Sequence, residues 1–234
     1  RDSAYGLEPL VTWYTETKDP EMKRMIDNLV DDLWGIAEVN REKGYATVRA
    51  VAPPGTAGVG YVIDALVRWY EVTGNESALK LAKYLTNWFV NYSGVIKEDG
   101  SFNVGTEVLP NGYDMSAHVE SKVRQLYGII RLGMVTQNQE LISWGKKVYD
   151  YVENFAGGIG FYPENLMEAS GSESENIKHM IQSAILLAKA GYPEYWDNVE
   201  RAARNHMVES ILTDVSWVRS PPSPPTDTEA ISYY

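Results

Sequence analysis

Carboxylate side chains stand at several junctions where a loop of this sequence is expected to meet a helix. Glu164 follows the glycine-rich turn Gly157–Gly160 and two aromatic residues, Phe161 and Tyr162. A carboxyl group held against apolar rings has a raised pKa, because burial disfavours its charged form, and such a group suits general acid catalysis. An exposed turn residue is the structural alternative for Glu164.

His118 and Glu120 lie near the start of a helix that the apolar periodicity predicts over Met115–Thr136. Imidazole and carboxylate groups are the usual proton carriers near neutral pH. A solvated first turn, in which Glu120 interacts favourably with the helix dipole, would explain the same residues without catalysis.

A third group opens the next expected helix. Ser172 and Glu175 have the spacing of a capping box, which is a structural role and leaves Glu173 as the better functional candidate. His179 follows Glu175 by one helical turn, so the two side chains would share a face. A Glu–His pair can ligate a metal or transfer protons, and packing explains it equally. One Glu without thiolates or clustered His offers too few ligands, so we predict no metal and no cofactor.

These considerations give two sets of predicted site residues. The predicted catalytic residues are Glu164, Glu173 and His118. Side chains that could hydrogen-bond sugar hydroxyls, hold a carboxylate or stack on a ring form the predicted substrate-binding set: Arg49, Glu120, Tyr162, His179, Arg204 and His206.

The helices that must position these residues repeat along the chain. Leu10–Thr17 and Leu66–Thr73 each end an apolar helix with a Trp-Tyr pair, before a turn and a second amphipathic helix. Similar turns follow at Gln137–Asn138 and Gly191–Pro193. Four helical hairpins therefore recur at intervals of roughly 55–63 residues.

Long loops rich in Gly, Pro and Asn join the hairpins: Gly44–Gly60, Tyr92–Met115 and Phe155–Ser172. An open solenoid has shorter repeats and connections, whereas long loops in a compact domain are usually functional. The sequence therefore predicts an all-α domain in residues 1–218, a toroid or partial toroid with the three loops gathered at one end. A proline-rich connector is expected over 219–234.

Composition narrows the choice of partner. The 234 residues carry a net charge of −11, which argues against nucleic acid and against an anionic membrane surface. The 16 Tyr and 7 Trp suit a cleft that binds an oligosaccharide or polysaccharide. The absence of Cys excludes disulfides and thiolate nucleophiles within this sequence. Neither composition nor motif selects a compartment, and extracellular, periplasmic and cytoplasmic locations stay open.

From about Thr56 to Val218 the sequence resembles the β-L-arabinofuranosidase-like glycosidases, whose catalytic domain is an (α/α)-barrel. The segments that carry the resemblance are Val123–Gly133, Gly157–Gly160, Ser172–Lys189 and Tyr195–Ser210.

The resemblance implies retaining hydrolysis of a glycosidic bond, with a glutamic acid as acid/base and a zinc-bound cysteine as nucleophile. It implies that Glu164 is the acid/base and that Glu173 occupies the position of a metal-binding Glu in a Glu-x-Cys motif. The chain departs from this pattern, because Glu175 stands at the cysteine position and no Cys exists.

Three functions follow from these observations. A glycoside hydrolase-like domain acting on oligosaccharides is the first hypothesis, as an active, incomplete or inactive form. A sugar epimerase or polysaccharide lyase on the same fold is the second, and a non-catalytic sugar-binding or scaffold protein is the third. A ring of six hairpins would need roughly 350 residues, so we expect an incomplete barrel that self-associates or joins a missing C-terminal half.

Overall fold

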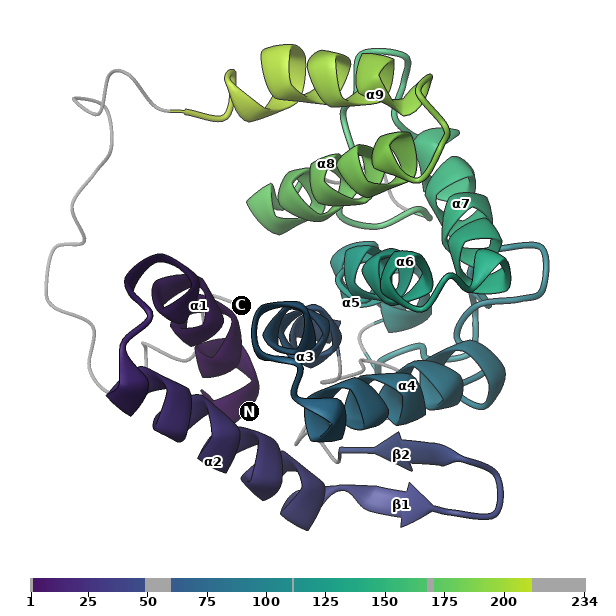
Figure 1. Cartoon of the computed structure of the whole chain (residues 1–234). Coiled ribbons are helices and arrows are strands. Elements are labelled where there is room, and N and C mark those ends of the chain that lie inside the picture. Colours follow the sequence, from purple (N-terminus) through teal and green to yellow (C-terminus); the bar gives the residue numbers. More distant parts are fainter. Residues whose placement is uncertain (1, 49–59, 111, 168–170, 212–234) are drawn as a thin grey trace, which may run out of the picture.

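The computed structural model describes residues 2–48, 60–110, 112–167 and 171–211, and this part of the chain is built mainly from helices (Figure 1). The larger elements, in chain order, are α1 (Asp2–Thr17), α2 (Pro20–Ile36), α3 (Gly60–Thr73), α4 (Glu76–Asn91), α6 (Leu126–Val135), α7 (Gln139–Glu153), α8 (Ser174–Lys189) and α9 (Tyr195–Arg201). The short ones are strands β1 (Glu38–Asn40) and β2 (Tyr45–Thr47), the 3₁₀ turn η1 (Met115–Ala117), helix α5 (Glu120–Val123) and the π-helical turn η2 (Ala202–Met207).

The helices pair into the four predicted hairpins, α1–α2, α3–α4, α6–α7 and α8–α9. Helices α1, α3, α6 and α8 pack in succession as an inner layer, and α2, α4, α7 and α9 lie outside them (Figure 1). This arrangement confirms the prediction of tandem helical hairpins arranged as a toroid or partial toroid.

The hairpin turns repeat in detail. A residue with positive φ follows the first helix of every hairpin: Lys18, Gly74, Gln137 and Gly191. This left-handed conformation ends a helix by turning its last carbonyls toward new partners. In three hairpins the next residue then caps the second helix through its side chain: Asp19, Asn75 and Asn138.

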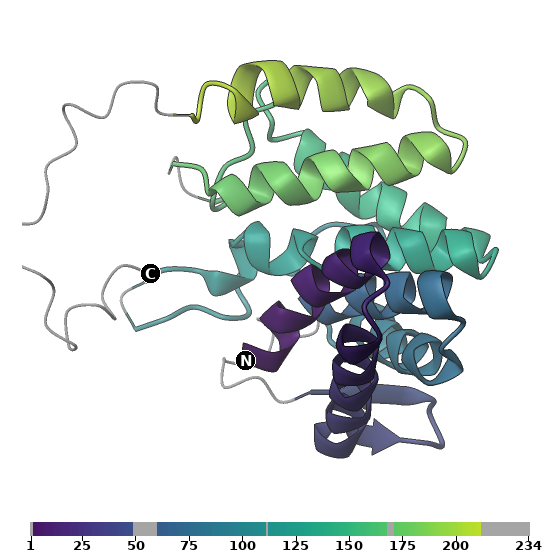
Figure 2. The same cartoon turned by 60° about the vertical axis from the view of Figure 1, so that its left-hand side comes forward.

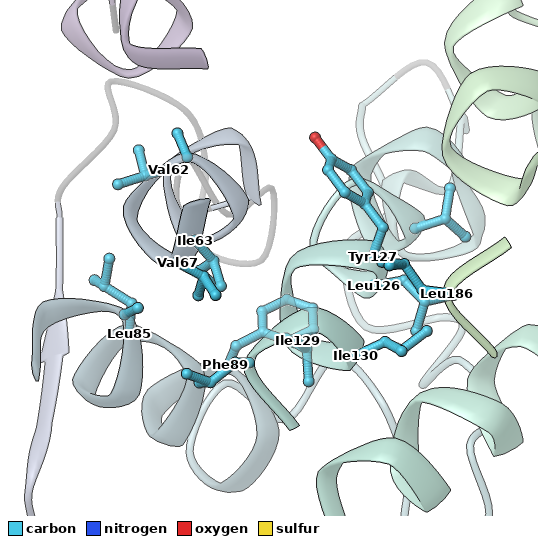
Figure 3. Close-up of a cluster of buried hydrophobic side chains, with 14 of the residues drawn as sticks. Val62, Ile63, Val67, Leu85, Phe89, Leu126, Tyr127, Ile129, Ile130 and Leu186 are labelled. Atoms are coloured by element: carbon cyan, nitrogen blue, oxygen red, sulfur yellow. The ribbon is translucent and has the colours of Figure 1, made fainter. Parts of the chain in front are cut away.

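A continuous apolar core lies between the two helix layers (Figure 3). Val62, Ile63 and Val67 of α3 are buried against Leu85 and Phe89 of α4 and against α6. Removing such side chains from water stabilises the fold by about 1.5–3 kcal/mol each. The core therefore fixes the inner helices, whose N-terminal ends receive the long loops.

The helix expected over Met115–Thr136 is interrupted, which corrects the prediction. It consists of η1, α5 and α6, and the backbone around His118 pairs with the loop before α8 instead of continuing a helix. The N–H of Val119 donates to the carbonyl of Glu164, and the N–H of Leu166 donates to the carbonyl of Ala117. This exchange of backbone partners breaks the helix.

Two of the three long loops meet, as predicted. The side-chain amide of Asn165, in the loop before α8, donates to the backbone carbonyl of Asp114 in the loop before α5. Both loops extend from the same side of the helices in Figure 2. The first loop contains β2 at its start, and its residues 49–59 lie outside the described residues, as does the proposed connector at 219–234.

One ion pair spans nearly the whole chain. The Lys178 ammonium of α8 lies 3.5 Å from the Glu8 carboxylate of α1, 170 residues earlier. The first and last inner helices are therefore within side-chain reach of each other. Among the described residues, no helix is long and apolar enough to cross a membrane.

Candidate active site

His118 and Glu173 come together at the loop-side ends of α5 and α8. The Nε2 atom of His118 lies 3.3 Å from Oε2 of Glu173. Glu173 is the residue before the first turn of α8 and makes no capping hydrogen bond with its side chain. The predicted capping box is wrong, because α8 begins at Ser174 and the Ser172 hydroxyl donates to the Glu173 carbonyl. Glu173 is thereby left to face His118.

The hydrogen bond at Nδ1 of His118 indicates which nitrogen of a neutral ring carries the proton. Nδ1 accepts a hydrogen bond from the backbone N–H of Ser121, with a distance of 3.3 Å. A neutral ring with a lone pair on Nδ1 carries its proton on Nε2, the atom that faces Glu173. Oε2 of Glu173 is buried and makes no aligned hydrogen bond in this conformation. The pair has the composition and spacing of a proton-transfer pair, and such contacts commonly tighten when substrate binds.

Glu120 lies in a second buried cluster beside the first. Its Oε2 accepts a hydrogen bond of 2.7 Å from Arg124, one turn later, and its Oε1 lies 3.8 Å from Nε2 of His179. His179 is fully buried and stacks on Tyr127, with ring centroids 5.4 Å apart. Burial lowers the pKa of His179, against the opposing effect of Glu120. His179 therefore pairs with Glu120, whereas the sequence had suggested Glu175 as its partner.

Tyr113 links Glu164 to this group. Its hydroxyl donates to Oε1 of Glu164 over 3.0 Å, and its ring lies 6.3 Å from that of His118. Burial raises the pKa of Tyr113 to about 12, and the charges of Glu164 and Glu173 add to this effect. Glu164 is thus hydrogen-bonded to a hydroxyl whose pKa also responds to the charge of Glu173.

Lys122 is buried behind the same segment. Its ammonium donates to the Met115 carbonyl over 2.7 Å and to the Ser121 hydroxyl over 3.0 Å. Burial lowers the pKa of Lys122 to about 8, although Glu107, Asp114 and Glu120 oppose the shift. The lysine ties η1 to α5 and so holds the backbone that carries His118.

The cluster has the residue types of a metal site. Ligand atoms of His118, Glu120 and Glu173 lie within 4.8 Å of one another. The prediction of no metal assumed that Glu173 has no clustered His, and that premise is wrong. Two features still oppose a cation, because the N–H of Ser121 at Nδ1 favours the tautomer of His118 that is protonated on Nε2, and Glu120 is engaged by Arg124. The absence of a metal stays a prediction.

Other predicted site residues lie elsewhere. Tyr162 is buried and donates to Glu153 over 2.9 Å, and burial raises its pKa. His206 stacks on Phe161 at 4.7 Å and, through Nδ1, accepts from the backbone N–H of Tyr162. Phe161 and Tyr162 therefore have partners other than Glu164.

Arg204 is exposed and pairs with Glu200 at 2.8 Å. Arg49 lies outside the described residues.

No family model and no curated protein matches the sequence. Solved structures do match the fold. Cellobiose 2-epimerase from Bacillus thermoamylovorans matches with a TM-score of 0.69 at 14% identity, and the match covers 91% of this chain and 61% of the epimerase chain. A GH76 α-mannanase from Bacteroides thetaiotaomicron gives a TM-score of 0.66 at 11% identity, and the match covers 89% of this chain and 57% of the mannanase chain. A glycosyl hydrolase of family 88 from Bacteroides vulgatus gives a TM-score of 0.62 at 14% identity, and the match covers 88% of this chain and 61% of the hydrolase chain.

These likenesses define the class of the protein as an (α/α) toroid of the six-hairpin type, a fold that carbohydrate-active enzymes share. The chain spans about three fifths of the length of these structures, which fits a partial toroid. None of these three is an arabinofuranosidase, so that finer resemblance gains no specific support.

Sequence reasoning missed Tyr113 and Lys122. Tyr113 occurs in an ordinary Asn-Gly-Tyr-Asp loop, and only the fold brings it to Glu164, 51 residues later. Lys122 lies in a stretch whose periodicity gives no sign of a buried ammonium.

Proposed function

We propose that this chain carries the proton-transfer groups of a glycoside hydrolase that acts on oligosaccharides, arabinofuranosides among them. The observation that supports this is that Glu164 is hydrogen-bonded to Tyr113, whose ring lies near that of His118, the residue that Glu173 contacts. Glycosidases require two carboxyl groups on either side of the scissile bond, one to protonate the leaving oxygen and one to activate water or attack carbon.

The roles follow from the partners of each group. Glu164, which accepts from the Tyr113 hydroxyl, is the acid/base. Glu173 is the second carboxylate, and His118 beside it either shares its proton or orients it. The chain spans about three fifths of the length of the solved toroids. That this shorter chain has the activity of a complete ring is therefore part of the proposal.

A sugar epimerase is the second candidate, because His118 and His179 each lie near a glutamate. Epimerisation removes a proton from one face of a carbon and returns one to the other, which suits two bases. The hydrolase is favoured because His179 is fully buried under Tyr127 and so has no exposed surface to offer a substrate.

The test is product analysis with the present chain on arabino-, manno- and cello-oligosaccharides. A hydrolase releases reducing sugar, an epimerase gives an isomer of equal mass, and a lyase leaves unsaturated ends. Glu164→Gln and Glu173→Gln keep side-chain shape and remove proton transfer, so each is expected to lower turnover by about 10²–10⁴-fold. Glu175→Gln is the matched control, because its carboxylate accepts from Ser174 on the exposed side of the same helix.

Unchanged turnover in Glu164→Gln would eliminate Glu164 as the acid/base. Products of equal mass would replace the hydrolase with the epimerase. Absence of both turnover and oligosaccharide binding at the site would overturn the proposal for this chain.

A further inference from the structure

A groove of about 770 Å³ lies between the outer helices α4 and α7, which follow one another around the outside of the ring (Figure 1). It shares no residue with the candidate active site. Ligand sites for small molecules commonly have volumes of about 300–1,000 Å³. The groove is lined by polar side chains, including Lys83, Asn91, Ser143 and Lys147, and by an apolar surface to which Val90, Leu132, Leu141 and Trp144 contribute.

Trp144 provides an aromatic surface in the groove. The ring is partly exposed and is held by an edge-on contact with Phe89, with centroids 6.1 Å apart. Its indole N–H donates to no other described residue, so it stays available. An aromatic ring with a free donor suits a sugar, whose C–H face packs on the ring while its hydroxyls hydrogen-bond at the edge.

The charge of the groove is opposite in sign to that of the protein. Lys83 and Lys147 form no ion pair with a described carboxylate, and Lys147 donates to the backbone carbonyl of Glu98. Glu140 is the one acidic residue among the lining side chains. Two lysines thus face a single carboxylate in a chain with a net charge of −11. A local positive field of this kind favours an anionic ligand.

We propose that this groove is a second carbohydrate-binding site, and that its ligand is an acidic oligosaccharide. A sugar ring packs on Trp144, the carboxylates of uronate units pair with Lys83 and Lys147, and a hydroxyl bonds Asn91. The site holds a polymer on the outside of the ring and does not depend on the chemistry proposed for His118, Glu164 and Glu173.

The test is calorimetric binding of tetragalacturonate to the present chain, without any measurement of turnover. Lys83→Gln and Lys147→Gln are each expected to weaken binding about tenfold, since each loses a charge-assisted contact. Trp144→Ala should weaken it at least as much. Lys80→Gln is the matched control, because Lys80 lies one turn from Lys83, over Tyr84, and outside the groove.

Two further ligands separate sugar recognition from charge. Neutral cellotetraose should bind at least tenfold more weakly than tetragalacturonate, and tetraglutamate, which is anionic but not a sugar, should also bind weakly. Equal binding of tetraglutamate, wild-type affinity in both lysine variants, or no binding at millimolar ligand would overturn the proposal. The assay measures binding without turnover, and its variants lie outside the candidate active site, so failure of the proposed hydrolase and failure of this site are distinguishable.

Discussion

Lys122 is almost completely buried, at 1% exposure, and its charge is stabilised by one carbonyl, one hydroxyl and more distant carboxylates. Its pKa of about 8 in the folded protein lies below the ordinary value of 10.5. Between these two values the unfolded chain binds more protons than the folded one. The free energy of unfolding must therefore rise with pH in this window, and burial of the charged form must lower stability below it.

We expect the lysine to add about 2 kcal/mol to the free energy of unfolding between pH 8 and pH 9.5, because each unit of pH is worth about 1.4 kcal/mol there. Urea denaturation of wild type and Lys122→Met at pH 7, 8 and 9.5 measures the effect. The difference between the two proteins should grow with pH in favour of wild type. If the free energies of unfolding of the two proteins changed with pH in parallel, Lys122 would not lose its proton on folding.

The residues with catalytic chemistry were partly predictable. His118, Glu164 and Glu173 were selected because each lies where a loop meets a helix, and the fold brings their segments together through Tyr113 and a short backbone bridge between His118 and Asn165. The partner of each residue was not predictable, since it comes from a segment about 50 residues away. The roles of these residues in catalysis stay predictions.

At the scale of helices, the inner layer depends on one close approach. Gly128 of α6 lies against α3 so closely that an added Cβ would come within 2.7 Å of the backbone nitrogen of Asp64. The same two helices are joined by a buried ion pair, in which Nε of Arg131 lies 2.6 Å from Oδ1 of Asp64. Backbone atoms cannot move aside as a flexible side chain can, so glycine is required at this position.

Gly128→Ala is therefore expected to lower the free energy of unfolding by about 1–3 kcal/mol, the usual effect of overpacking. Gly35→Ala is the matched control, because Gly35 is also helical and has no atom within 4 Å of an added Cβ. That change should be neutral or stabilise by up to about 1 kcal/mol, since alanine restricts the unfolded chain. Thermal or urea unfolding measures both, and equal effects would argue against the tight helix contact.

Helical periodicity was sufficient to predict the hairpins, because each helix buries one face regardless of its partners. It failed at residues 115–125, where the predicted helix is broken. Arg124 and Gln125 are good helix formers, so no local signal marks the break. The cause is tertiary, because Ala117 and Val119 exchange hydrogen bonds with the loop before α8. Long-range backbone pairing of this kind is invisible to a local pattern.

At the scale of the whole molecule, apolar side chains in η2 and just after it are exposed. Met207, Val208 and Ile211 are 52%, 56% and 61% exposed. Solved toroids of this class are longer, and this chain spans about three fifths of them. Exposed apolar surface of this kind favours association. We expect a second copy of the chain to cover it in solution.

Sedimentation of the 26.3 kDa chain should therefore show self-association. A Val208→Lys, Ile211→Lys double variant should weaken the dissociation constant at least tenfold, because a charge in an apolar contact is costly. Val108→Lys is the control, since Val108 is likewise exposed, at 57%, but belongs to the loop between α4 and η1. A wild-type monomer at all concentrations would contradict the prediction.

The contact between Glu8 and Lys178 has a consequence for the order in which the molecule forms. Most helix contacts in this protein join elements that are neighbours in the sequence, so the hairpins need little loop closure and are expected to assemble rapidly. The pair that joins α1 to α8 closes a loop of 170 residues, which is entropically the most demanding step. It should form late in folding, and because both side chains are partly exposed it adds little to stability. The helices at the two ends of the molecule are therefore expected to open, and to exchange their amide protons with solvent, long before the central hairpins do.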